Sequence, residues 1–169
     1  MNYLALIDTR TTGNRYDVTP LFADPAAFAA LVADLVRPFD AAAVDVVAGI
    51  DALGFILGTA VAWQLGKGFV PVRKGGRLPV AADEVELVDY TGRPKTLALR
   101  RDALRPGARV LVVDEWVETG AQMSAAVTLL ERAGGVIIGL AAIGIDDDPR
   151  TQALRARYHC HSVWKEPEA

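Results

Sequence analysis

The chain alternates short runs of Val, Ile and other apolar residues with longer segments in which apolar residues recur every three or four positions. The first pattern is typical of strands buried on both faces, and the second of helices with one buried face. Strands and helices that alternate in this way form a parallel sheet covered by helices, so we predict an α/β fold. The expected strands are 44–50, 69–72, 109–113 and 136–145, and the expected helices are 25–38, 54–65, 119–133 and 151–157.

Composition limits what such a fold can do. The 169 residues are 51% hydrophobic, and we expect a single domain over residues 1–169. The 18 Lys and Arg against 21 Asp and Glu give a net charge of −3, which argues against a protein that coats nucleic acid. The longest apolar stretches fall short of the roughly 20 residues that a membrane-spanning helix needs. Cys160 has no partner for an internal disulfide and the amino terminus lacks the pattern of an export signal, so we expect a cytoplasmic protein.

The segment VLVVDEWVETG, residues 110–120, predicts the binding chemistry. Asp114 and Glu115 follow a buried strand, and their carboxylates can accept hydrogen bonds from sugar hydroxyls. A helix that starts near Thr119 offers unpaired N–H groups and the positive end of its dipole to a phosphate. One molecule with both a diol and a phosphate would satisfy both groups. The alternative is structural: the acids end a strand, and Thr119 with Gln122 forms a capping box.

The same segment resembles the phosphoribosyl pyrophosphate (PRPP) binding motif of type I phosphoribosyltransferases, a hydrophobic strand followed by two acids and a Thr-Gly loop. Three other segments, in matching order, most resemble adenine phosphoribosyltransferases. YDVTPLFADP is similar to their amino-terminal hood, VVAGIDALGFILG to their pyrophosphate loop, and FVPVRKGGRLP to the next strand and basic loop. The resemblance implies a hood over about residues 1–24, a core over about 25–169 and a mobile flap around YTGRPK.

The resemblance also implies a function. The protein would transfer phosphoribose from PRPP to a purine base and release pyrophosphate, as in purine salvage. Mg²⁺ would be carried on PRPP near Asp114 and Glu115, with no direct ligand from the protein, and the chain would form a homodimer. Two alternatives stay open: a noncatalytic protein that senses PRPP or a nucleotide, and a phosphoribosyltransferase for a different nucleobase.

Matching positions in the motifs imply a role for each candidate residue. Asp114 and Glu115 would bind the ribose hydroxyls, and Tyr16 and Trp116 would bind the base. The residues around the 5′-phosphate would be Glu118, Thr119, Gly120, Ala121 and Gln122. The residues around pyrophosphate would be Asp51, Ala52, Leu53, Gly54, Arg73 and Lys74. Glu118 and Asp89 would act in catalysis.

The pyrophosphate loop departs from the adenine-enzyme pattern at one position. Leu53 stands where these enzymes usually have arginine, so a cation that contacts pyrophosphate is missing. Its loss costs about 1.5–3 kcal/mol of binding unless another residue replaces it. Arg77 and Arg93 are the candidates for that replacement, on their charge and their place in loops.

The base side of the pattern departs as well. The hood reads Arg-Tyr-Asp at 15–17 in place of the usual Phe-Arg-Asp, and Asp89 stands in place of the flap Glu. Adenine enzymes have a small residue at the position of Glu118, whereas hypoxanthine-guanine relatives have an Asp close to the purine imidazole. Glu118 would therefore face the base and act as acceptor or general base. The structural alternatives are a solvated acid at a helix start for Glu118, a strand-end acid for Asp89 and core packing for Trp116.

Other nucleotide and metal motifs are not favoured. Alternation on a short strand would put His159 and His161 on one face and Cys160 on the other, and no second ligand cluster accompanies them. The loop KGGR lacks the Ser or Thr of a Walker phosphate loop, and no GxGxxG follows a strand.

Overall fold

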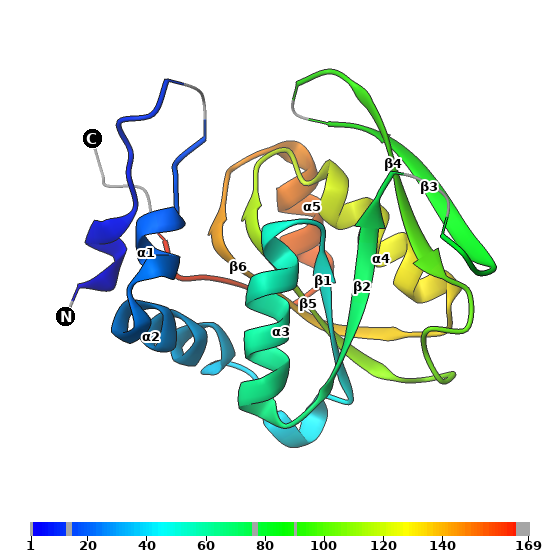
Figure 1. Ribbon diagram of the computed structural model, residues 1–169. Helices are drawn as coiled ribbons and strands as arrows, with labels where there is room; N and C mark the ends of the chain where they lie inside the picture. Colours follow the sequence, from blue (N-terminus) through cyan, green and yellow to red (C-terminus); the bar gives the residue numbers. More distant parts are fainter. Residues whose placement is uncertain (1, 13–14, 76–77, 90, 165–169) are drawn as a thin grey trace.

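A seven-stranded sheet forms the centre of the computed structural model, which describes residues 2–12, 15–75, 78–89 and 91–164 (Figure 1). Its strand order is β3-β4-β2-β1-β5-β6-β7. Five strands are parallel, and β3 and β4 add an antiparallel hairpin at the β2 edge, so the α/β prediction is confirmed with a mixed sheet. The strands are β1 (Val46–Ile50), β2 (Gly68–Lys74), β3 (Ala82–Val88), β4 (Pro94–Arg100), β5 (Arg109–Val117), β6 (Val136–Ile145) and β7 (Cys160–Ser162). The α-helices are α1 (Thr19–Ala23), α2 (Pro25–Val36), α3 (Leu53–Leu65), α4 (Ala121–Arg132) and α5 (Pro149–Arg157), and the 3-10 turns are η1 (Tyr3–Leu6) and η2 (Ala41–Ala43).

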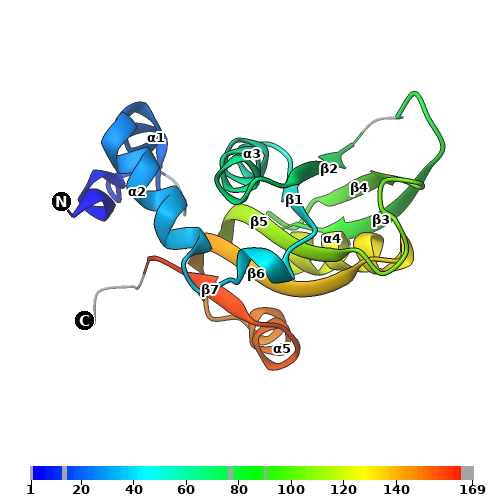
Figure 2. The ribbon, with the colours of Figure 1, turned by 90° about the horizontal axis from the view of Figure 1, so that it is seen from below.

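Helices cover both faces of the parallel strands (Figure 2). α2 and α3 lie on one face, and α4 and α5 lie on the other. Successive side chains of β5 alternate between the two cores: Leu111 and Val113 pack with α2 and α3, whereas Val110 and Val112 pack with α4. Burial on both faces explains why this strand is an unbroken apolar run in the sequence.

α3 begins in direct contact with the sheet. A Cβ built on Gly49 of β1 would lie 2.3 Å from the carbonyl oxygen of Gly54 and 2.8 Å from the Phe69 ring. Only glycine permits this approach. The first turn of α3 is thereby fixed at the carboxyl end of β1, next to the end of β5.

β5 extends further than the sequence predicts. The expected strand ends at Val113, but β5 continues to Val117 because it stays paired with β6, with Trp116 opposite Gly144. Gly144 leaves room for the indole, since a Cβ at that position would lie 2.4 Å from the Trp116 ring. Asp114 and Glu115 are therefore held inside a paired strand, which fixes their backbone.

The N-terminal segment and the β3-β4 hairpin lie at opposite edges of the sheet (Figure 1). The Tyr3 hydroxyl donates to Asp34 of α2 at 2.6 Å, and Asp8 pairs with Asp17 in an antiparallel bridge. In the hairpin, β3 pairs with β4 over its whole length, from Ala82 opposite Arg100 to Val88 opposite Pro94. No described helix combines the length and apolar character needed to cross a membrane.

Candidate active site

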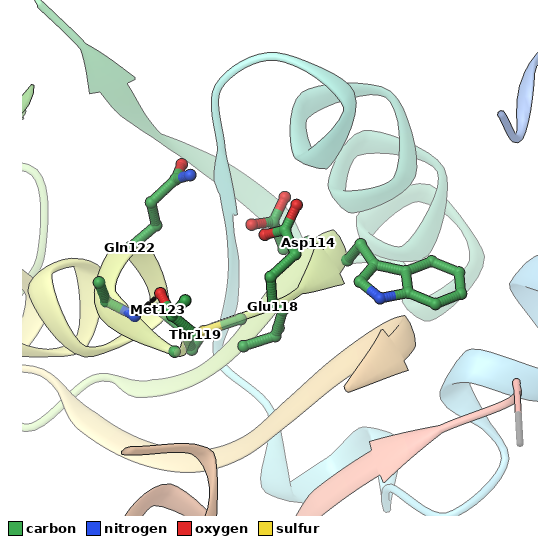
Figure 3. Close-up of a pocket in the computed structure, with 9 residues that line it drawn as sticks. Asp114, Glu118, Thr119, Gln122 and Met123 are labelled. Atoms are coloured by element: carbon green, nitrogen blue, oxygen red, sulfur yellow. Dashed lines mark hydrogen bonds between the residues drawn. The ribbon is translucent and has the colours of Figure 1, made fainter. Parts of the chain in front are cut away.

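Acidic side chains gather where β5 ends and α4 begins (Figure 3). A small pocket at this point is lined by Asp114 and by residues 116–123. In Figure 3 the side chains of Asp114 and Glu118 reach toward each other, and Thr119 and Gln122 stand at the start of α4. The acids and the helix start that the sequence predicts as a site are thus brought together.

Asp114 lies against the first turn of α3. A Cβ built on Gly54 would come within 2.8 Å of Asp114 Oδ1, so glycine at this position lets the helix start meet the carboxylate. Burial raises the pKa of Asp114 to about 7, and the charges of Glu115 and Glu118 add to that rise. The backbone N–H of Glu115, which donates to Oδ1 at 2.9 Å, and the charge of Lys74 oppose it. Asp114 therefore titrates near neutral pH.

Arg15 joins the N-terminal segment to two of these acids. Its Nε lies 2.8 Å from Oε1 of Glu118, and its Nη2 donates to Oε2 of Glu115 at 3.3 Å. Burial raises the pKa of both glutamates, and the Arg15 charge is the largest influence that lowers each one. One guanidinium thus offsets part of the cost of placing two carboxylates close together.

Glu118 retains an unused acceptor. Its Oε1 is buried and accepts no hydrogen bond from the described residues, although Arg15 Nε lies 2.8 Å away as an ion-pair partner. A buried acceptor without a donor is costly, and such atoms are commonly satisfied by a ligand or water. Glu118 therefore suits a partner that brings an N–H or O–H group.

The start of α4 lies at the pocket, where the sequence predicts a phosphate site. Gly120 precedes the helix with φ of +73°, and a Cβ there would lie 3.2 Å from Thr151 of α5. No side chain caps the helix by a bond to its second or third N–H, so the alternative of a Thr119–Gln122 capping box is wrong. Thr119 Oγ1 instead accepts from the Ala121 N–H at 3.4 Å. The N–H groups of this turn point their partial positive charge at the pocket.

The residues expected around pyrophosphate divide into two groups. Asp51 and Ala52 follow β1 and are joined by a cis peptide bond, and Leu53 and Gly54 open α3 beside Asp114. Lys74 lies close enough to lower the pKa of Asp114, Glu115 and Glu118. Arg73 is the preceding residue on β2, and alternation along the strand turns it to the other face. The strand geometry therefore favours Lys74 over Arg73 as a cation of the pocket.

Comparisons with known proteins agree with this geometry. The sequence matches the phosphoribosyl transferase domain family over residues 19–167. The chain belongs to the phosphoribosyltransferase family. It is 47% identical over 124 residues to the adenine phosphoribosyltransferase of Acidothermus cellulolyticus, which covers 73% of this chain and 70% of that protein. It is 46% identical over 125 residues to that of Dinoroseobacter shibae, covering 74% and 69%.

A solved structure extends the similarity to nearly the whole chain. The adenine phosphoribosyltransferase of Rhodothermus marinus matches with a TM-score of 0.84 at 32% identity, covering 95% of this chain and 94% of that one. The type I phosphoribosyltransferase fold expected from the motifs is confirmed.

In this phosphoribosyltransferase, Tyr16 and Trp116 lie in an aromatic cluster with Trp164. The Tyr16 ring is 5.3 Å from that of Trp116 and 5.7 Å from that of Trp164, both in edge-to-face contacts. The Trp116 indole N–H donates to Asp146 at 2.6 Å. These contacts favour the packing alternative for Trp116, since its ring and its donor are both engaged by the protein.

Asp89 serves the hairpin turn. Its Oδ1 accepts from the backbone N–H groups of Thr91 and Arg93 and from the Thr91 hydroxyl at 2.6 Å, which lowers the pKa of the carboxyl. A base must gain a proton during the reaction, and these contacts hold Asp89 as an exposed carboxylate, so they favour the strand-end alternative. Of the two arginines proposed to replace the missing cation, Arg93 belongs to this turn and Arg77 lies outside the described residues.

Arg15 is the site residue that sequence reasoning missed. In the sequence, Arg15 stands out only as a change in the hood, and no motif gives it a role. A signal was present: the hood arginine stands one position earlier than in the adenine-enzyme pattern, and Glu118 is an acid where that pattern has a small residue. Their contact spans 103 positions of the chain, a separation that no local pattern reveals.

His159 and His161 lie on one face, as alternation along a short strand predicts. Both rings lie against Phe39, at 5.0 and 6.3 Å, which puts them on the same face. Among the described residues, no group of three or more His, Cys, Asp or Glu side chains is arranged to hold a metal ion.

Proposed function

We propose that this protein transfers phosphoribose from PRPP to a purine base and releases pyrophosphate. Adenine is the first base to test, because the similar proteins are adenine phosphoribosyltransferases. The observation that carries the proposal is the position of the Asp114 carboxylate, which touches the first turn of α3 and shares a pocket with the first turn of α4. Two helix starts around an acid pair suit a sugar that bears a phosphate on each side.

Each part of PRPP has a group of matching chemistry in this proposal. Asp114 and Glu115 accept hydrogen bonds from the ribose hydroxyls. The N–H groups of residues 119–122 bind the 5′-phosphate, and those at 51–54 bind pyrophosphate with Lys74 nearby. Positive charge fixed at the leaving group stabilises the transition state, in which negative charge builds on pyrophosphate.

Glu118 takes the proton that the base releases. A ring nitrogen of the base forms a bond to C1 of the ribose as the bond from C1 to the pyrophosphate oxygen breaks, and that oxygen keeps the electron pair. The N–H proton lost by the base passes to the carboxylate of Glu118, which is buried beside Arg15. Burial raises the pKa of Glu118, which suits a carboxylate that must accept a proton near neutral pH.

The test is incubation with PRPP, Mg²⁺ and a panel of purine and pyrimidine bases, followed by assays of nucleotide and pyrophosphate. Product from adenine supports purine salvage in the manner of the similar proteins. Product from hypoxanthine or guanine alone points to the different-base alternative. PRPP binding without product from any base overturns the enzymatic proposal.

A noncatalytic PRPP sensor is the second candidate, and Leu53 is the observation that favours it. Leu53 is an apolar first residue of α3 at a position where adenine enzymes usually have a cation. Without that cation, the binding of the pyrophosphate leaving group is weaker. The acid pair and the α4 start would serve binding without turnover, so the panel experiment also separates these two candidates.

The proposal also includes the metal ion, the oligomeric state, the domain organisation and the cellular location of the protein. Mg²⁺ arrives bound to PRPP, as part of the substrate. The chain forms a homodimer, for which the outer face of α3 is suited because Ile56 and Trp63 are exposed there, Trp63 by 87%. The single domain spans residues 1–169 with its hood at 1–24, tied to the core by Tyr3 and Arg15, and the protein works in the cytoplasm.

A further inference from the structure

We infer that Arg15 is a positioning residue, which holds the Glu118 carboxylate in place for the nucleobase and keeps it ionised. The inference rests on the proposed transferase function. It concerns a residue that stands where the hood of adenine enzymes usually has phenylalanine.

The backbone at Arg15 and directly after it is held by contacts with residues earlier in the chain. The Thr11 hydroxyl donates to the Arg15 carbonyl oxygen at 2.6 Å, and Asp17 is bridged to Asp8. The Tyr16 ring packs edge-on against Trp116 of β5. A guanidinium on so constrained a backbone loses little freedom when it binds a carboxylate, and it can hold that carboxylate in one orientation.

The contacts of Arg15 with Glu118 and Glu115 use different nitrogens. Nε is 2.8 Å from Glu118, and Nη2 makes the longer contact of 3.3 Å with Glu115. Ribose hydroxyls can therefore displace Nη2 from Glu115 while Nε stays on Glu118. Arg15 would remain beside the proton acceptor when the substrate is bound.

Glu118 depends on this cation because its other neighbours largely repel it. The charged groups that face Glu118 from the packed elements are Arg15, Lys74 of β2, Asp114 and Glu115 of β5, and Asp146 beyond β6. Three of the five are acids. Without Arg15, Lys74 would be left to oppose both burial and these acids, so Glu118 would bind a proton at higher pH.

The experiment measures kcat against pH for wild type, Arg15→Gln, Arg15→Lys, Glu118→Gln and the double variant Arg15→Gln/Glu118→Gln. Arg10→Gln is the matched control, since Arg10 lies in the same segment with its side chain 94% exposed. Melting temperatures confirm that each variant is folded. The Michaelis constants for PRPP and for the base are recorded with each profile.

Arg15→Gln is expected to lower kcat at neutral pH at least tenfold and to move the acid limb of the profile up by about one pH unit. Arg15→Lys should restore most of that shift, because it keeps the charge. In the Glu118→Gln background, Arg15→Gln should change kcat less than twofold, because the residue through which it acts is already gone. Arg10→Gln should match wild type.

Two results would overturn the inference and leave the transferase proposal standing. One is a folded Arg15→Gln variant with the wild-type profile, and the other is an undiminished effect of Arg15→Gln in the Glu118→Gln background. A wild-type protein that turns over no base would overturn the transferase proposal, and the inference with it.

Discussion

The residues that we propose for phosphoribose, called the phosphoribose half, and those that we propose for the base, called the base half, are held in place in different ways. The phosphoribose half consists of an acid pair on a paired strand and of two helix starts with glycines: a Cβ at Gly54 would lie 2.8 Å from Asp114, and Gly120 has a φ of +73°. The base half consists of side chains from distant segments, among them Arg15, Glu118 and the ring of Tyr16. Backbone constraints keep the first half close to the family pattern. The base half can change through paired substitutions, so the base specificity can change while PRPP binding is preserved.

The largest effect is expected from a substitution that disrupts the phosphoribose half and leaves the base half intact. Asp114→Asn should weaken PRPP binding by about 100-fold or more, because it removes the charged acceptor for the ribose hydroxyls. Titration calorimetry with PRPP and Mg²⁺ measures this. Asp102→Asn is the control, since Asp102 is an exposed carboxylate paired with Arg100 far from the pocket. Unchanged PRPP affinity in Asp114→Asn would remove Asp114 from the ribose site.

The same substitution should stabilise the ligand-free protein at high pH. The pKa of Asp114 is raised from 3.8 to about 7, so the folded state holds a proton that the unfolded state has released between those values. The raised pKa of Asp114 therefore stabilises the folded state fully below about pH 4, and this contribution is lost as the pH rises to about 7. Asp114→Asn removes that loss, and at pH 8 its free energy of unfolding should exceed that of wild type by about 2 kcal/mol. Urea unfolding at pH 5 and pH 8 provides the comparison. If Asp114→Asn were less stable than wild type at pH 8, ionised Asp114 would not destabilise the folded protein, and the prediction would be wrong.

A smaller effect on PRPP affinity is expected at Leu53, at the start of α3, where we propose that pyrophosphate binds. Leu53→Arg should raise PRPP affinity about tenfold, since it returns a cation to the start of α3. Leu53→Met separates this charge effect from a change in packing and should leave affinity within twofold. If Leu53→Arg also raises kcat, the missing cation limits pyrophosphate departure. An affinity that stays flat would mean that Lys74 or another cation already fills that place.

The smallest effect should fall on the aromatic cluster. Trp116→Phe keeps an aromatic ring over Gly144 and removes the indole N–H, which leaves the Asp146 acceptor without that donor. The free energy of unfolding should drop by about 1–2 kcal/mol, with kcat and the Michaelis constant for the base within about twofold of wild type. Thermal unfolding and steady-state kinetics check this. A large rise in the Michaelis constant for the base would instead return Trp116 to the base site.

The fold and the phosphoribose half were predictable because their signals are local. Alternating apolar runs predict β1, β5 and β6, and the Asp-Glu pair followed by Thr-Gly predicts an acid pair next to a helix start. The continuation of β5 to Val117 was not predictable, since it depends on Gly144 of β6 making room for Trp116. The contact of Arg15 with Glu118 was missed because it depends on how the N-terminal segment folds back over β5. The turn role of Asp89 was an open alternative that its hydrogen bonds to Thr91 and Arg93 favour.

The central claim is that the two halves work together as a transferase. The most direct measurement is the amount of nucleotide and of pyrophosphate formed in one reaction from PRPP, Mg²⁺ and adenine, with hypoxanthine and guanine in parallel reactions. The account predicts equimolar nucleotide and pyrophosphate from at least one of these purines, and no product from the Asp114→Asn variant. Tight PRPP binding by the wild-type protein with neither product from any purine would contradict it.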